Sequence, residues 1–572
     1  MTTNLHAIVD DVLRHAETSP HENVWISRVS MDDHHARADE LGRRRAAGEP
    51  LPLLGTTFAV KDNIDVAGMP TTAACPAFAY TPSRGATVVQ KLLDAGAMLV
   101  GKTNMDQFAT GLVGTRSPYG VCRNVHDRDY IAGGSSSGSA VAVAAGLVTF
   151  ALGTDTAGSG RVPAALNGIV GMKPTRGRIS TSGVVPACRS LDSVSVFARS
   201  IAEARTVTRI ASGFVEADVY SRRARSGTLF PSRFRFGVPR DGQLKFFGDE
   251  AARALYGKAL ARLESIGGRR VTIDYAPFDD AAKLLYGGPW VAERYAALGG
   301  FVATQPQAVD PVVRSIIQGA TKFSAADAFD GMYSLESLRR RTEATWDAVD
   351  VLALPTTGTI YRVDDVLADP FTLNANLGYY TNFVNLLDLS ALALPAGVRP
   401  SGLPFGISLI APAWHDDALC ALGERYDGTP SPTEAETAPS DYINLAVVGA
   451  HLSGMPLNHQ LTSRGARFVR GCTTSPRYRL YALANTTPAK PGLVHVGAAG
   501  EGGASIAIEV WSMTTQAFGA FVAEVPPPLA IGTVELEGGT AVKGFVCEPR
   551  ATAGATDVTR FGGWRAYVTR EH

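Results

Sequence analysis

Residues 133–161 read GGSSSGSAVAVAAGLVTFALGTDTAGSGR, and this stretch decides how the chain around it folds. It begins with serines between glycines at 133–139, continues with an apolar run at 140–152, and ends with a second glycine-flanked serine, Ser159. The apolar run is too short to cross a bilayer. Its pattern predicts a helix over 137–146 and a buried strand over 147–155, with a serine-bearing loop beside each.

The segments on either side continue this alternation of strand and helix. Strand-like runs, LLGTTFAVKDNI and MLVGKTN, occupy 53–64 and 98–104, and a helical run, ATVVQKLLDAGA, lies between them at 86–97. Strands alternating with helices through glycine-rich connections predict an α/β fold with a sheet core surrounded by helices. The same patterns predict helices over 5–16, 249–264, 311–319, 335–348 and 416–426, and strands over 350–356, 389–397 and 402–412.

Composition narrows the class of protein. The 572 residues are 45% hydrophobic and 19% charged, with 54 Lys and Arg against 54 Asp and Glu. A zero formal net charge offers neither the basic footprint of a nucleic-acid-binding protein nor a polybasic membrane patch, so a small-molecule substrate is expected. The N-terminus lacks the apolar core of a signal peptide, and the six cysteines form no CxxC pair. We therefore expect a cytoplasmic protein without disulfides, metal or cofactor.

A change in composition divides the chain. Residues 427–440, DGTPSPTEAETAPS, are rich in Pro, Thr, Ser and Glu and resemble an interdomain linker. We predict a first domain at 1–426 and a second at 441–572. Short alternating runs such as YRLYAL and GTAVKGFVC indicate that the second domain is small and mostly β.

A catalytic serine needs a group that takes its proton. Histidine is the usual base, but His126, in the polar segment RNVHDRDY, is the only histidine between His35 and His415. Lys61 follows the apolar residues of FAVK, and a lysine deprived of solvent loses its proton readily enough to act as a base. Taken alone, this stretch suits a lysine at the surface better than a buried one.

Five segments together resemble the amidase signature family, in its order and spacing, from about residue 20 to about 426. They are VKDNIDVAGMPTT (60–72), GKTNMDQFATG (101–111), GGSSSGSAVAVAAG (133–146), GTDTAGSGRVPAALNGIVGMKPTRGRIS (153–180) and GVVPACRSLDSV (183–194). The resemblance implies the amidase signature fold, with a mixed β-sheet core, and hydrolysis of an amide.

The resemblance also implies a role for individual residues. Ser159 would be the nucleophile, Ser135 the bridging serine after a cis peptide bond, and Lys61 the base. The backbone N–H groups of Thr156, Ala157, Gly158 and Ser159 would form the oxyanion hole. Asp155 and Arg161 would hold that loop in place, and Ser136 and Ser137 would be structural.

Two further segments, GRISTSGVVPACRSLDSVSVFA (177–198) and YGGPWVAERYAA (286–297), resemble the allophanate hydrolases of this family. This resemblance implies that Tyr286 and Arg294 bind allophanate, with Arg294 on its carboxylate. It also implies a homodimer and a link to a urea carboxylase or to cyanuric-acid degradation. The alternative for Arg294 is a surface ion pair with its neighbour Glu293.

The second domain resembles the C-terminal domain of these enzymes and the γ-glutamyl cyclotransferase fold, through VVGAHLSGMPLNHQL at 447–461. His451 is a candidate acid or base for decarboxylating the first product, and a structural loop histidine is an equal alternative. Glu509, in an alternating strand, is a candidate to point into the same cleft as His451, but a solvated strand face is the favoured interpretation. Three alternatives for the whole chain stay open: a general small-amide amidase, an amidase subunit of a tRNA-dependent amidotransferase, and a second domain that only binds or assembles.

Overall fold

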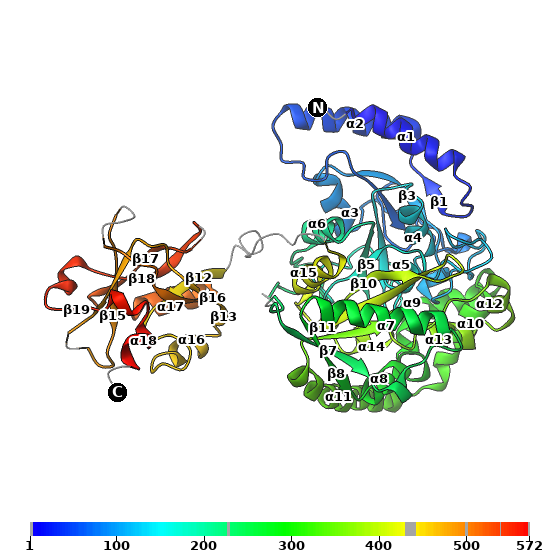
Figure 1. The fold of residues 1–572 in the computed structure, drawn as a ribbon. Coiled ribbons are helices and arrows are strands. Elements are labelled where there is room, and N and C mark those ends of the chain that lie inside the picture. Colours follow the sequence, from blue (N-terminus) through cyan, green and yellow to red (C-terminus); the bar gives the residue numbers. More distant parts are fainter. Residues whose placement is uncertain are drawn as a thin grey trace. The chain divides into compact units, whose positions relative to one another are not determined.

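The computed structural model describes residues 4–225, 229–428, 442–484, 486–497, 502–537 and 539–569. The chain divides into two compact units, residues 1–431 and 432–572 (Figure 1). Each unit has its own hydrophobic core. From residue 429 onward, the predicted linker at 427–440 lies outside the described residues.

The first unit is built on one mixed sheet. Its eleven strands, in the spatial order β1-β3-β2-β4-β6-β5-β10-β11-β9-β7-β8, include both parallel pairs, such as β2 with β4, and antiparallel pairs, such as β4 with β6. The predicted α/β fold is therefore confirmed. In chain order the strands are β1 Trp25–Arg28, β2 Thr57–Lys61, β3 Met98–Thr103, β4 Phe150–Asp155, β5 Val170–Lys173, β6 Ser193–Ala198, β7 Phe234–Pro239, β8 Gly268–Ile273, β9 Val351–Pro355, β10 Leu389–Val398 and β11 Pro404–Pro412.

Helices surround this sheet (Figure 1). One of them is longer than its apolar spacing predicts: α11 begins ten residues before the expected start at 335, because Ser324 and Asp327 form a capping box at its N-terminus. The helices are α1 Leu5–Thr18, α2 Met31–Ala46, α3 Thr87–Asp94, α4 Ser137–Ala144, α5 Val162–Leu166, α6 Ile201–Ala211, α7 Glu250–Ser265, α8 Ala276–Gly287, α9 Val291–Thr304, α10 Pro311–Gln318, α11 Ala325–Ala348, α12 Val363–Ala368, α13 Thr372–Leu377, α14 Phe383–Leu386 and α15 Asp416–Asp427.

The central strands β2 and β4 are buried on both faces. Every residue of both strands is buried, and successive side chains of a strand point to opposite faces. Phe58 and Val60 pack into one core cluster, whereas Ala59 packs into another, together with residues of α4. Lys61 follows Val60 and so shares the face of Ala59, the face that α4 covers. The pattern therefore directs the Lys61 side chain toward the glycine-serine stretch that leads into α4.

The second unit is mostly β, as predicted. It holds a five-stranded sheet in the order β13-β16-β12-β18-β17 and a three-stranded sheet in the order β15-β14-β19. Its elements are β12 Tyr442–Val447, α16 His459–Thr462, β13 Arg467–Thr473, β14 Tyr478–Ala482, β15 Pro491–His495, β16 Ala507–Thr514, α17 Thr515–Ala523, β17 Leu529–Glu535, β18 Ala541–Cys547, β19 Thr556–Asp557 and α18 Trp564–Val568.

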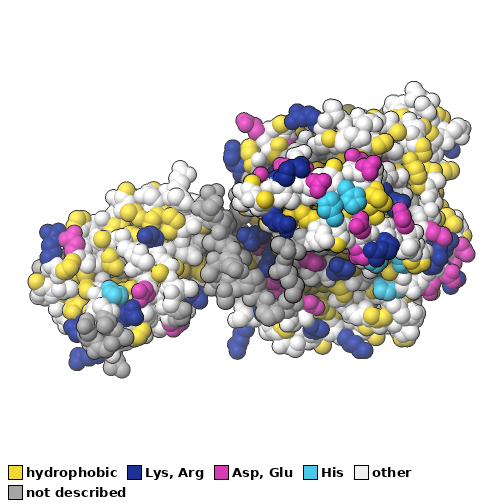
Figure 2. Space-filling model, turned by 90° about the horizontal axis from the view of Figure 1, so that it is seen from above, with side chains coloured by type: hydrophobic (Ala, Val, Ile, Leu, Met, Phe, Trp, Pro, Cys, Tyr) yellow, Lys and Arg dark blue, Asp and Glu magenta, His cyan; other side chains and the backbone are white. Residues whose placement is uncertain are grey.

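The surface shows no segregation of charge on the face drawn in Figure 2, where basic and acidic side chains are interspersed. This distribution fits the balanced composition of the chain. Among the described residues, no helix combines the length and the apolar character that a membrane span requires.

Candidate active site

Lys61 lies at the carboxyl end of β2, fully buried. Its Nζ donates to Ser135 Oγ and to Thr154 Oγ1, both at 2.8 Å. Loss of solvation lowers the pKa of Lys61 to about 7, although the carboxylates of Asp106 and other buried aspartates raise it in part. The surface position that the local sequence favoured is therefore wrong. The strand carries the side chain inward, under α4, and a large fraction of Lys61 is neutral near pH 7.

Ser135 connects Lys61 to the second serine. The peptide bond between Gly134 and Ser135 is cis, as the resemblance implied, and Ser135 Oγ donates to Ser159 Oγ at 3.0 Å. The backbone here is held by Asp106, whose N–H donates to the Ser135 carbonyl at 3.0 Å. A Cβ at Gly134 would lie 2.1 Å from Asp106 Oδ2, so only glycine fits at that position.

The loop that carries Ser159 is fixed by a buried ion pair. Arg161 donates to both carboxylate oxygens of Asp155 at 2.9 Å, and the Gly160 N–H donates to the same carboxylate at 3.0 Å. Both side chains are fully buried, and the Arg161 guanidinium holds the pKa of Asp155 below its ordinary value despite the burial. The predicted structural role of Asp155 and Arg161 is therefore seen in these contacts.

Asp192 supports the same loop from the other side. Its carboxylate accepts hydrogen bonds from the Thr156 hydroxyl and from the N–H groups of Ala187 and Cys188. Burial raises the pKa of Asp192 to about 6. A change of charge at Asp192 would therefore act on the segment that holds Thr156, Ala157, Gly158 and Ser159.

Tyr286 and Arg294 lie at the end of α8 and within α9, and the fold brings them together. Arg294 is 1% exposed; it donates to Thr110 Oγ1 at 2.9 Å and to the Tyr286 hydroxyl at 3.4 Å. The alternative of a surface ion pair with Glu293 is wrong, because Glu293 accepts from the N–H and the hydroxyl of Ser190. The positive charge of Arg294 also lowers the pKa of Lys61, which places the two groups in one electrostatic environment.

His451 lies in a loop of the second unit after β12. Its ring stacks on Phe545, with centroids 5.0 Å apart, and its Nε2 is 3.0 Å from Gln460 Oε1. Burial lowers the pKa of His451. His459 is exposed. In the described part of the chain, no three His, Cys, Asp or Glu side chains are grouped as a metal site.

Glu509 is not on a solvated strand face, and that expectation is wrong. The residue is 6% exposed, and its carboxylate accepts from the N–H and hydroxyl of Ser453 and from Trp511 Nε1. Arg565, from α18, pairs with it at 2.9 Å. Alternation along β16 could not reveal this burial, because the covering residues come from a distant loop and from the end of the chain.

Sequence reasoning missed several residues that surround the candidate site. Thr154, the second partner of Lys61, lies within the quoted TDTAGSGR but carries no signal of its own. Asn385 donates to the carbonyls of Asp155 and Leu191 at 2.7 and 3.0 Å, from more than 190 positions away in sequence. No local pattern marks such a contact, because only the tertiary fold creates it.

Comparison with known proteins agrees with this geometry. The amidase family model matches residues 7–420, and the model for the allophanate hydrolase C-terminal domain matches residues 443–569. Urea amidolyase from Lachancea kluyveri is 45% identical over 586 aligned positions, which cover 97% of this chain and 32% of that protein. The chain thus spans about a third of the length of the urea amidolyases that it matches.

Solved structures show the same relationship over the whole chain. Allophanate hydrolase from Kluyveromyces lactis is 42% identical, with a TM-score of 0.80 and coverage of 100% of this chain and 98% of that one. The urea amidolyase of the same organism is 41% identical, with a TM-score of 0.79 and coverage of 100% and 36%. With its serine-bearing loops, its mixed sheet and these matches, the chain belongs to the amidase family and carries an allophanate hydrolase C-terminal domain.

Proposed function

We propose that this protein hydrolyses allophanate, urea bearing a carboxylate, through Lys61, Ser135 and Ser159. The observation that carries the proposal is the continuous line of hydrogen bonds from Lys61 Nζ through Ser135 Oγ to Ser159 Oγ, at 2.8 and 3.0 Å. A nucleophile, a proton carrier and a base are the parts that acyl transfer requires, and here they are buried away from bulk water.

The proposed reaction begins when Ser159 Oγ attacks the terminal amide carbonyl of allophanate. Its proton passes to Ser135, whose own proton passes to neutral Lys61. The backbone N–H groups of Thr156, Ala157, Gly158 and Ser159 stabilise the oxyanion. When the C–N bond breaks, protonated Lys61 returns the proton through Ser135 to the leaving nitrogen, and ammonia departs. Water then gives a proton to the same relay, and its oxygen attacks the acyl carbon. The bond to Ser159 Oγ breaks, the relay returns the proton to Ser159, and N-carboxycarbamate is released.

Substrate selection is proposed to rest on Arg294 and Tyr286. A buried guanidinium beside a phenol hydroxyl is suited to a carboxylate, since charge-assisted hydrogen bonds are the strong ones. Arg294→Ala is expected to lower kcat/KM for allophanate about 100-fold while changing turnover of simple aliphatic amides only about threefold. Arg199→Ala, at an exposed position, is the matched control. Equal loss on both kinds of amide would instead favour a general small-amide amidase.

We propose that the first domain comprises residues 1–426 and the second domain residues 441–572, with residues 427–440 as the linker. For the second domain we propose that His451 takes part in decarboxylating N-carboxycarbamate. A ring that burial keeps neutral can accept or relay a proton at pH 7. In the full chain, His451→Asn is expected to leave the first ammonia release unchanged and to slow carbon dioxide release about tenfold. His459→Asn, at an exposed neighbouring histidine, is the control. Unchanged carbon dioxide release would leave the unit a binding or assembly role.

Two relations to other proteins are also proposed. Carboxylation of urea is one reaction that would supply allophanate, and the matching urea amidolyases support that link. Degradation of cyanuric acid is the other source. The homodimer and the cytoplasmic location stay predictions.

A further inference from the structure

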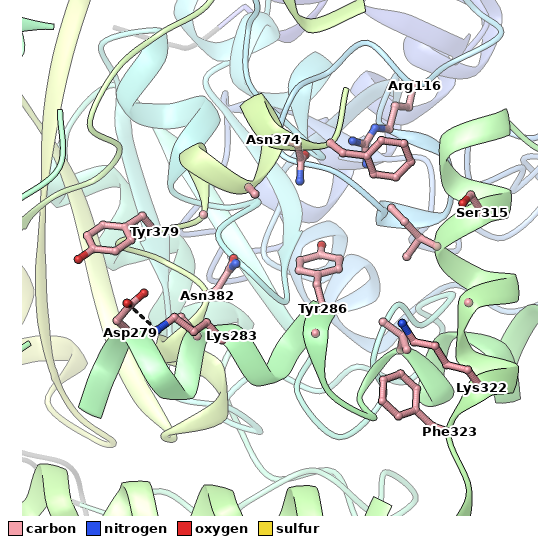
Figure 3. A pocket seen from close by; sticks show the side chains of 18 residues that line it. Arg116, Asp279, Lys283, Tyr286, Ser315, Lys322, Phe323, Asn374, Tyr379 and Asn382 are labelled. Carbon is pink, nitrogen blue, oxygen red and sulfur yellow. Dashed lines mark ion pairs between the residues drawn. The ribbon is translucent and has the colours of Figure 1, made fainter. Parts of the chain in front are cut away.

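A cavity of about 530 Å³ lies beside Tyr286 in the first unit (Figure 3). Most of its wall comes from three segments: α8 from Asp279 to Gly287, residues 315–323, and residues 371–382 around α13. Arg116 and Val291 complete the lining. Allophanate would occupy only a small part of this space, so the shape of the cavity alone cannot hold it in one position. Polar groups at one end of the cavity are needed to bind it there. Two buried carboxamides, Asn374 and Asn382, line the cavity near Tyr286.

Asn374 has one end of its carboxamide bound and the other free. It is 8% exposed, and its Oδ1 accepts the backbone N–H of Leu112 at 2.8 Å. Because that N–H requires the oxygen, the orientation of the amide is fixed, and Nδ2 points into the cavity toward the Tyr286 hydroxyl (Figure 3). No described residue offers Nδ2 an acceptor within hydrogen-bonding distance. Nδ2 lines the cavity without a partner in its wall, so this N–H₂ group is available to donate to a ligand.

The segment from Thr110 to Leu112 connects Asn374 to the proposed carboxylate site. Arg294 donates to the Thr110 hydroxyl, and Leu112, two residues later, donates to Asn374. Arg294 also contacts the Tyr286 hydroxyl at 3.4 Å. The guanidinium, the phenol and the carboxamide are therefore held around a common segment, and each can present an N–H or O–H donor.

The opposite wall leads to the serine loop. Asn382 is 9% exposed, and its Oδ1 has no partner among the described residues. The preceding residue, Thr381, lies against the serine loop, because a Cβ at Gly158 would be 2.5 Å from Thr381 Oγ1. The cavity wall at Asn382 is thus continuous with the loop that carries Ser159.

We propose that Asn374 is a further substrate-binding residue, which determines specificity by donating its Nδ2–H to a carboxylate oxygen of the substrate next to Tyr286 and Arg294. This inference rests on the proposed function and names one more contact for the same substrate. The Arg294 guanidinium and the Asn374 N–H₂ group can both donate to the same oxygen, and the guanidinium is charged, so a carboxylate is favoured there over a neutral amide. Asn374 acts on binding, and the chemical step at Ser159 does not involve it.

The test is Asn374→Asp in the full chain. The substitution keeps an oxygen for the Leu112 N–H but replaces the donor with a second oxygen that repels a carboxylate. We expect KM for allophanate to rise about 10- to 100-fold with kcat within about threefold, and turnover of propionamide to change by less than about threefold. Asn376→Asp is the matched control, because Asn376 lies on the same helix, donates to Tyr361 Oη, and does not line the cavity.

Binding without turnover provides a second measurement. In Ser159→Ala protein, Asn374→Asp should weaken malonamate, a carboxylate-bearing amide, about 10- to 100-fold by calorimetry. Should the aspartate variant not fold, Asn374→Ser, which adds no charge, should show a smaller rise of KM with kcat unchanged. An unaltered KM, or an equal loss with allophanate and propionamide, would overturn the proposal. If wild-type protein did not turn over allophanate, the proposed function would fail, whereas the malonamate measurement would still decide the role of Asn374.

Discussion

Replacing Ser159 by alanine is expected to lower kcat for allophanate by at least about 10⁴-fold, while the protein stays folded and KM changes little. The hydroxyl is the atom that forms the acyl-enzyme, and its removal also ends the line of hydrogen bonds from Lys61 through Ser135. The measurement is ammonia release by purified protein under saturating substrate, together with a thermal melt. Thr154 Oγ1 also accepts from Lys61 Nζ, but it lies within β4 and not in the loop that carries Ser159, so we do not expect it to replace the nucleophile.

The matched control is Ser137→Ala, two residues after Ser135 in the same glycine-serine stretch and equally buried. It should retain activity within about tenfold of the wild type. If Ser159→Ala kept more than about a tenth of the activity, the assignment of the nucleophile would be wrong. If both variants lost activity together, the stretch would matter for structure rather than for chemistry.

Lys61→Met is expected to lower kcat by about 10³-fold or more, since methionine fills a similar volume but accepts no proton. In the wild type, activity depends on neutral lysine, so kcat/KM should rise with pH through about 7, the pKa that burial imposes on Lys61. A pH series on wild type and variant, with ammonia release as the readout, checks both statements. The residual activity of the variant should not show this rise, and a rise that persisted would assign the base to another group.

The same substitution predicts a difference in stability with a defined sign. Between about pH 7 and pH 10.5, unfolded Lys61 binds a proton that the folded state has released, so the wild type gains stability as pH increases. Below about pH 7 the folded state must bury the charged lysine. Lys61→Met should therefore be most stabilising, relative to the wild type, at or below pH 7, and this advantage should shrink toward pH 10.5. Paired thermal melts across that range measure the difference.

The amino-acid sequence predicted the fold class from its own patterns, and through the family resemblance it singled out the residues of the candidate site. Alternation of strands and helices around 133–161 predicted the α/β sheet, because period and apolar content are local properties. The sequence predicted the burial of individual side chains less well, because burial depends on packing between distant segments as well as on the local pattern. Taken alone, the FAVK stretch favoured a surface position for Lys61, which the structure buries, and the alternating pattern around Glu509 suggested solvent where the structure has a covered carboxylate.

Contacts between distant segments decide which polar side chains are buried and which line a cavity, and the sequence does not show these contacts. Arg294 has the same sequence neighbours whether it faces solvent or the protein interior, and only the packing of α9 against the Thr110 segment decides that it is buried. No sequence pattern distinguishes Asn374 from other asparagines in short helices. Only the structure shows that its oxygen accepts a hydrogen bond and that the residue lines a cavity.

By itself, the sequence determined which residue types are present and where strands, helices and tight glycine-dependent turns can form. It placed Lys61 at the end of one strand, and Ser135 and Ser159 in the loops beside a helix and another strand. Only the tertiary structure decided that these three side chains meet, because β2 and β4 pair in parallel and bring their carboxyl ends to the same edge of the sheet. That edge, under α4 and closed from water, is what lowers the pKa of Lys61 and joins the three groups into one line.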